Sequence, residues 1–175
     1  MIALVALLGC AAAWRPGVPG RFDLVVPDGW SITENRRWLG NDVFTLADPA
    51  ARATISIQLV RVDAPSADVP LDLLAEARAL SMGRSLGVVN SRSDMHQIAV
   101  DGHEAWAVTG RRRWQFVEGD YTAVFAHVGR HLAAVTLQTP SGALDRSLRG
   151  WAIVLESLRF PRDPVPADAP HFEPD

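Results

Sequence analysis

The chain has 175 residues, of which 48% are hydrophobic and 21% charged, as is usual for one globular domain with a buried core. Its formal net charge of -3 gives no general attraction to phosphate polymers, so we expect no nucleic-acid partner. The single cysteine, Cys10, excludes an internal disulfide framework and a cysteine-rich zinc site.

The chain begins with an apolar run, Ile2 to Leu8, that has the length of a signal-peptide core and is too short to span a bilayer. The segment Leu7-Leu8-Gly9-Cys10-Ala11 resembles the lipobox of bacterial lipoproteins, in which the cysteine receives the lipid. We therefore expect a signal peptide over 1–9 and a lipidated N-terminus with a flexible tether over 10–20. No basic residue precedes the apolar run, which points to a start upstream of Met1. In the alternative interpretation, the run is a buried strand and Cys10 a small core residue.

The first half of the chain is predicted to contain strands at 22–26, 43–46 and 54–62, the last because its apolar residues alternate with period two. The turn Pro27-Asp28-Gly29 closes the first strand. A helix of about three turns is expected over 71–83, where leucines recur at helical spacing.

The second half is predicted to form an antiparallel meander with turns at Asp101-Gly102, Glu118-Gly119-Asp120 and Gly129-Arg130. The four strands are expected at 88–100, 103–117, 120–128 and 131–139. A closing helix should follow, capped by Ser141. Its apolar stripe is predicted to comprise Leu144, Leu148, Trp151, Leu155 and Leu158.

Both faces of the last hairpin are apolar if Val128 pairs with His131. One face then carries Val124, Ala126, Val128, Ala133, Val135 and Leu137, and the other carries Phe125, Leu132 and Ala134. We therefore expect an α+β fold in which helices flank both faces of an antiparallel meander, an α/β/α sandwich. The proline-rich residues 161–175 are expected to be a disordered tail.

Three segments carry a resemblance to a known family: Phe22 to Trp30 with its Pro-Asp-Gly-Trp turn, Ile98 to Ala105, and Leu155 to Phe160. Together with the order of the predicted elements, they resemble the PsbP-like family and its DcrB-like lipoprotein relatives over about 21–160. The resemblance implies an antiparallel sheet between helices. It also implies a binding or scaffolding role, since members of this superfamily are mainly non-catalytic partners of other proteins.

One motif permits a catalytic alternative, because Gly83-Arg84-Ser85-Leu86-Gly87 matches the G-x-S-x-G pattern of serine hydrolases. That mechanism needs the serine on a turn from a strand into a helix, whereas here the motif follows a predicted helix and precedes a strand. The glycines are better explained as a helix stop and a flexible connection. A small hydrolase using Ser85 is therefore the second hypothesis.

The histidines give no metal site by spacing. His103-Glu104 could open a zinc-binding H-E-x-x-H helix, but Ala107 occupies the position of the second histidine. His127 and His131 should point to opposite faces of the hairpin, so they cannot close on one metal ion. We expect no metal and no cofactor.

Two groups of residues are candidates for contact with a partner. Arg111 and Arg113 belong to a basic run that we interpret as a solvated strand end, with contact to anionic lipid headgroups as the alternative. Trp30 and Trp38 lie near predicted loops and could line a partner groove, whereas Trp106 and Trp151 are expected in the core.

The sequence thus predicts a non-enzymatic protein, anchored by lipid at Cys10 in the bacterial cell envelope, that binds a protein partner or a small apolar ligand. Ala11 after the cysteine favours the outer membrane, with the domain facing the periplasm. A purely structural spacer is a third possibility. The membrane, through the anchor, and an envelope protein are the expected partners.

Overall fold

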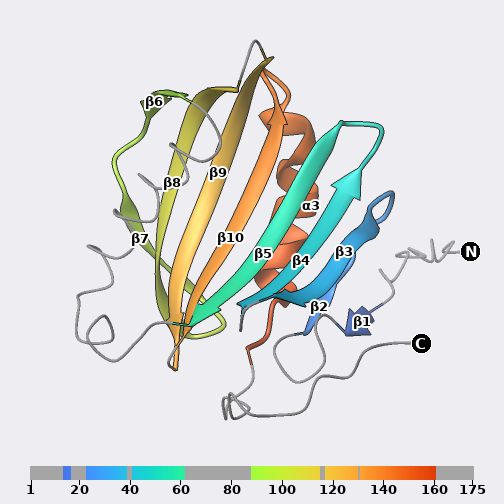
Figure 1. The fold of residues 1–175 in the computed structure, drawn as a ribbon, viewed down its shortest axis with the longest axis vertical. Helices are drawn as coiled ribbons and strands as arrows, with labels where there is room; N and C mark the ends of the chain where they lie inside the picture. Colours follow the sequence, from blue (N-terminus) through green and yellow to red (C-terminus); the bar gives the residue numbers. More distant parts are fainter. Residues whose placement is uncertain are drawn as a thin grey trace, which may run out of the picture.

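The computed structural model describes residues 14–16, 23–38, 41–61, 88–114, 117–129 and 131–160. They form one large antiparallel sheet, a small two-stranded sheet and the helix α3 (Figure 1). Cys10, the helix expected over 71–83, Ser85 and the tail 161–175 lie outside the described residues, so the sequence-based expectations for them stay predictions.

The small sheet pairs β1 (Trp14–Pro16) with β2 (Asp23–Val25), and β1 falls within the segment expected to be a flexible tether. The large sheet contains β3 (Ser31–Trp38), β4 (Asn41–Asp48), β5 (Ala53–Arg61), β6 (Val88–Arg92), β7 (His96–Val100), β8 (His103–Trp114), β9 (Val117–Val128) and β10 (His131–Pro140). The helix α3 spans Leu144–Ser157.

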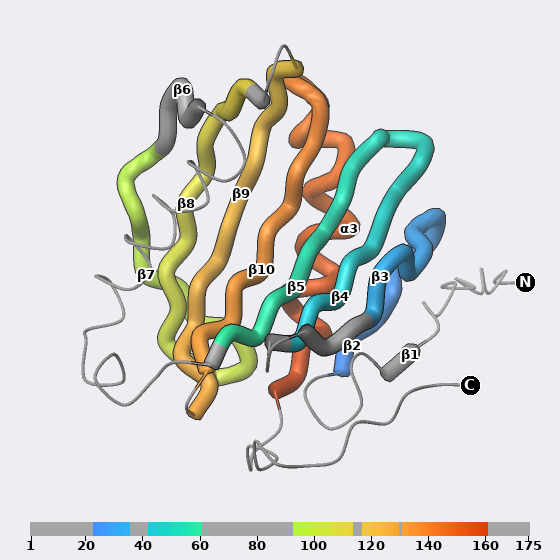
Figure 2. Tube along the Cα trace, in the orientation of Figure 1, coloured from blue at the N-terminus to red at the C-terminus, as the bar shows by residue number. Residues whose placement is uncertain are grey.

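The strands of the large sheet lie in the order β3-β4-β5-β10-β9-β8-β6, and β7 also pairs with β8 (Figures 1 and 2). Short hairpins join neighbours along the chain, as the meander prediction required. The pairing of β5 with β10 joins the two halves of the chain, because it brings Ala53–Arg61 beside His131–Pro140. Strands far apart in sequence therefore form the centre of the sheet.

The predicted register of the last hairpin is confirmed, because His131 lies opposite Val128. The two predicted faces belong to two separate buried clusters. The first contains Val124, Ala126, Val128, Ala133, Val135 and Leu137 together with residues of β4, β5 and α3. The second contains Val108, Tyr121, Ala123, Phe125, Leu132 and Ala134. Both sheet faces are therefore buried at their centres.

The expected sandwich with helices on both faces is wrong for the described part of the chain. There the fold is mostly antiparallel sheet with the single helix α3, which covers the face of the first cluster (Figure 1). Two apolar faces require cover, but apolarity alone does not make the cover helical. The alternation of the strands thus identified the buried faces without identifying what lies on them.

Two strand predictions also need correction. The turn expected at Glu118–Asp120 lies inside β9, and the β8–β9 hairpin turns between Trp114 and Val117 instead. Gly119 is required there for space, because a Cβ at this position would lie 2.6 Å from the carbonyl oxygen of Thr139 on β10. The single strand expected over 88–100 is divided into β6 and β7, which pair with different parts of β8.

The buried side of α3 differs from the predicted stripe. Ser147, Gly150, Trp151 and Val154 are buried, which confirms Trp151 as a core residue, whereas Leu148 is 41% exposed. Small residues let the helix approach its neighbours closely, and a search for large apolar residues does not find them. The predicted cap is also wrong, since Ala143 is the N-cap residue and makes no side-chain capping bond.

The close contact at Gly150 is made by Trp30. An added Cβ at Gly150 would lie 2.6 Å from Trp30 Nε1, so the indole lies directly against the helix backbone. Trp30 follows the Pro27–Gly29 turn, in which the Trp30 N–H donates to the carbonyl of Pro27 and Gly29 adopts a φ of 82°. The turn motif therefore positions the indole against α3.

We predict that Gly150→Ala destabilises the domain by about 1–3 kcal/mol, because the new methyl group overpacks against the Trp30 ring. In a Trp30→Val background, the same change should instead stabilise by up to about 1 kcal/mol, since alanine has the higher helix propensity. Urea unfolding of the four proteins measures both effects. Equal effects of Gly150→Ala in the two backgrounds would contradict the contact.

Candidate binding groove

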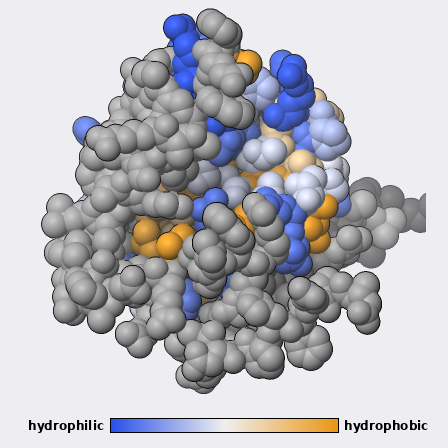
Figure 3. Space-filling view, in the orientation of Figure 1, coloured by the Kyte–Doolittle hydropathy of each residue, from blue (hydrophilic) through white to orange (hydrophobic). Residues whose placement is uncertain are grey.

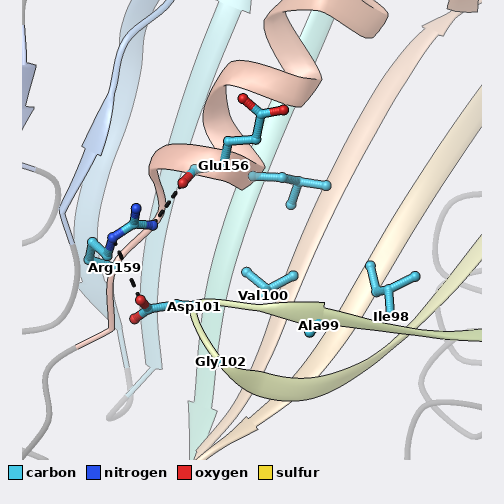
Figure 4. A pocket seen from close by; sticks show the side chains of 8 residues that line it. Ile98, Ala99, Val100, Asp101, Gly102, Glu156 and Arg159 are labelled. Carbon is cyan, nitrogen blue, oxygen red and sulfur yellow. Dashed lines mark hydrogen bonds and ion pairs between the residues drawn. The ribbon is translucent and has the colours of Figure 1, made fainter.

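The described residues contain a groove where β7 and the following turn approach the C-terminal end of α3 (Figure 4). Its volume is about 480 Å³. The lining residues are Ile98, Ala99, Val100, Asp101, Gly102, Leu155, Glu156 and Arg159. A groove of this size can hold one or two side chains or a short aliphatic chain.

The position of the groove is fixed by Asp101. Asp101 and Gly102 form the tight turn between β7 and β8, with φ angles of 50° and 77° that suit an Asp-Gly pair. The Asp101 carboxylate accepts a hydrogen bond from the Phe160 N–H at 2.7 Å and lies 3.6 Å from Arg159 Nε. The hairpin end is thereby joined to the segment that leaves α3.

The same segment is joined to β2 by main-chain hydrogen bonds. The Asp23 N–H donates to the carbonyl of Arg159 at 2.9 Å, and the Arg159 N–H donates to the carbonyl of Asp23 at 2.8 Å. Two residues earlier, Ser157 Oγ accepts a hydrogen bond from the Val25 N–H at 2.9 Å. The C-terminal end of α3 is therefore held between β2 and the β7–β8 turn.

The groove combines an apolar floor with a charged rim. Ile98 and Leu155 are partly buried against the first cluster, and Val100 belongs to it. The rim carries the carboxylates of Asp101 and Glu156 and the guanidinium of Arg159. Arg159 Nη1 donates to the main-chain carbonyls of Glu156 and Leu158, whereas the Glu156 carboxylate points away from Arg159 (Figure 4). The rim thus has a net negative charge.

None of the lining residues is a nucleophile placed beside a general base. No group of three or more potential metal ligands occurs in the parts of the chain that the structure describes. On the face shown in Figure 3, the visible described residues form small hydrophobic patches between hydrophilic ones. The groove is therefore the strongest candidate site within the described ranges.

The predicted partner-contact residues lie elsewhere. Trp30 is partly buried against the first cluster and α3, and Trp38 is the last residue of β3. Arg111 and Arg113 are on β8, with 54% and 56% of their side chains exposed. The structure does not bring these residues together with the groove lining.

The arginine run is a paired strand end. Arg111 Nε lies 3.2 Å from Asp120 Oδ1, and Arg113 forms an ion pair with Glu118. Arg112 donates a hydrogen bond to Oε1 of Gln138, on β10, at 2.6 Å.

The hydrogen bond and the charge of Arg113 hold the pKa of the Glu118 carboxyl below its ordinary value. Asp120 also accepts from the Gly142 N–H at 2.6 Å and so helps to hold the loop before α3.

Two of the described histidines, His127 and His131, lie on the neighbouring strands of the last hairpin. The register of β9 and β10 places His127 and His131 on opposite faces of the sheet. His103 instead packs its ring edge-to-face with Phe160, with 5.5 Å between ring centres. No helix among the described residues is long and apolar enough to cross a membrane.

Sequence reasoning missed the groove although it identified several of its parts. The Asp101-Gly102 turn was recognised, and Leu155 to Phe160 was recognised as a closing motif. Nothing in the sequence showed that the two segments, more than fifty residues apart, meet through Asp101 and Arg159. An acidic residue in the turn and a basic one after the helix were the available signals, and both are common on surfaces.

No family model matches the chain, and no curated protein matches it. Solved structures do match. The Synechocystis PsbP protein CyanoP has a TM-score of 0.60 and 15% identity over 91% of this chain and 98% of its own. LpqN of Mycobacterium tuberculosis, described as involved in cell envelope biogenesis, has a TM-score of 0.58 and 16% identity over 81% and 85%. The Ran-binding protein Mog1p of Saccharomyces cerevisiae has a TM-score of 0.54 and 9% identity over 86% and 96%.

The chain therefore has a PsbP-like fold, as its motifs predicted. At these identities the likeness concerns the fold alone. The chain also matches a protein of Bacteroides thetaiotaomicron with a TM-score of 0.55 and 11% identity over 84% of its residues, but it spans about half (47%) of that longer chain.

We predict that Arg113→Gln raises the pKa of Glu118 toward its ordinary value, because the neutral side chain no longer favours the carboxylate. The sign follows from the lowered pKa: the pairing contributes above the unfolded-state pKa and is lost as the pH falls through the folded-state value. Titration of the side-chain carboxyl by NMR measures the change. Arg111→Gln is the control and should raise this pKa less, and an equal rise in the two variants would contradict the assignment.

Proposed function

We propose that this protein is a non-enzymatic binding module of the bacterial cell envelope, anchored by lipid at Cys10, whose groove beside α3 takes a protein partner or a small apolar ligand. The observation that carries the proposal is the groove itself. An apolar floor open to a charged rim is an arrangement suited to recognition, and its residues include no reactive pair.

The structural neighbours support this function by their own roles. The yeast neighbour is a Ran-binding protein, and the mycobacterial neighbour is involved in cell envelope biogenesis. A fold does not determine a function, so these roles support a binding module in the envelope without naming its partner.

The anchor would place the groove near the membrane. Trp14 is the fourth residue after Cys10, so the connection can reach at most about 14 Å. Pro16 of β1 pairs with Asp23 of β2, and Asp23 in turn pairs with Arg159 at the groove. A lipid on Cys10 would therefore hold the groove at the membrane-proximal end of the domain. The membrane that we propose is the outer membrane, with the domain facing the periplasm.

A large partner would also extend beyond the groove. Arg111 and Arg113 offer exposed cationic surface, and we keep them, with Trp30 and Trp38, as proposed secondary contacts. Because each arginine already pairs with an acidic residue, a partner would have to compete with Asp120 and Glu118 for these charges. We therefore expect their contribution to be smaller than that of the groove.

Photocrosslinking in living cells tests the proposed site. A benzophenone amino acid at Glu156, which lines the groove, should give a discrete crosslinked product, and the product should disappear when Ile98→Glu places a charge on the apolar floor. The matched control is the same amino acid at Asp145, an exposed carboxylate position on α3 that does not line the groove. Equal products from positions 145 and 156, or none from 156, would contradict the groove as the binding site.

We further predict that Cys10→Ala releases the protein from the membrane fraction. Stable anchoring needs more than one acyl chain, and alanine can carry none. Uptake of an alkyne fatty acid, followed by fluorescent detection, measures lipidation directly. An unlabelled wild type whose membrane association is unchanged by Cys10→Ala would refute the anchor.

A further inference from the structure

The strand that forms one wall of the groove has a sheet edge with no described partner. β7 pairs through one edge with His103–Ala107 of β8. No strand among the described residues pairs with its opposite edge. His96, Gln97 and Ala99 of β7 are exposed. Main-chain donors and acceptors on such an edge can accept another strand.

This edge runs beside the apolar part of the groove. Ile98 and Val100 of β7 line it together with Leu155 of α3, and side chains alternate between the two faces of a strand. A chain that added to β7 would therefore direct every second side chain to the groove side of the sheet. Edge addition would supply affinity through the main chain, and the groove would select the alternate side chains.

The charges of the groove favour a cation over an anion. Asp101 is already bonded to Phe160 N–H and Arg159, and Arg159 also donates to two main-chain carbonyls. The exposed carboxylate of Glu156 gives the rim its net negative charge. A fatty acid or an anionic phospholipid would bring a second negative group to this rim, whereas a basic side chain complements it.

We propose that the groove binds an extended segment of a partner protein, which adds to β7 as a further strand. Apolar side chains at alternate positions enter between Ile98 and Leu155, and a basic side chain at the end of the segment meets Glu156. This inference deepens the proposed function and rests on it, because it specifies the occupant of the same groove.

A synthetic peptide provides the probe. We choose fluorescein-labelled Arg-Thr-Leu-Thr-Leu-Thr-Arg, whose symmetric sequence allows either strand direction, and we measure its binding to the purified protein by fluorescence anisotropy. Replacing both arginines by glutamate should weaken binding about fivefold or more, as expected for an exposed charge contact of about 1 kcal/mol. Replacing both leucines by serine should abolish measurable binding.

Backbone methylation distinguishes strand addition from simple groove filling. Alternate amides of an added strand face the neighbouring strand, so N-methylation of one alternate set should abolish binding. Methylation of the other set should leave binding nearly unchanged. Equal effects of the two sets would overturn the strand-addition proposal.

Protein variants locate the contacts. Glu156→Gln should weaken the arginine peptide about fivefold and leave the glutamate peptide no weaker, whereas the matched control Asp145→Asn should change neither. Amide chemical shifts of the domain should move in 96–102 and 155–159. Binding that depends equally on Glu156 and Asp145, or shifts confined to other segments, would overturn the proposal.

Competing ligands separate this inference from the proposed function. If laurate perturbs the groove amides and the peptide does not, the groove binds an apolar small molecule and only the peptide proposal fails. If a second copy of the protein occupies the groove and excludes the peptide, the occupant is this chain itself and the peptide proposal also fails. If neither ligand perturbs the groove and no crosslink forms at position 156, both proposals fail.

Discussion

The position of α3 on the sheet is the constraint on which the rest of the described structure depends. At its centre the helix is held by Trp30, whose indole lies on the bare backbone of Gly150. At its end it is held by Asp101, which joins the β7–β8 turn to Arg159 and Phe160, and by β2. The first contact sets how close the helix lies to the Pro27–Gly29 turn, and the second sets the width of the groove. The candidate site thus depends on the contacts that hold α3 in position on the sheet.

Much of the sheet could be predicted because its signals are local. Alternating apolar residues identified β5, and a two-residue turn fixed the register of Val128 with His131. The prediction failed where a local signal had two meanings. Glu118, Gly119 and Asp120 have the composition of a turn, but they lie in a strand because Arg111 and Arg113 pair with the two carboxylates and because Thr139 leaves no room for a side chain at Gly119.

The groove and the helix packing could not be predicted for a related reason. The buried positions of α3 include Ser147 and Gly150, whose small size leaves room for neighbouring groups to pack close to the helix. A search for a stripe of large apolar residues does not find such positions. Leu148 satisfied the stripe and is exposed. Likewise, Asp101, Glu156 and Arg159 are ordinary surface residues until the fold places them around one apolar floor. Trp30 illustrates the same limit, because the sequence predicted it as a residue that contacts a partner and did not indicate that it packs on α3.

The central claim is that the groove between β7 and the end of α3 is the surface with which the protein binds, and hydrogen exchange measured by mass spectrometry tests it most directly. The domain is compared alone and in complex with the envelope partner that crosslinks at position 156. The account predicts slower exchange in 96–102 and 155–160 and little change in 111–120, where the arginines are paired within the sheet. Protection confined to 111–120, with unchanged exchange along β7 and the end of α3, would contradict it.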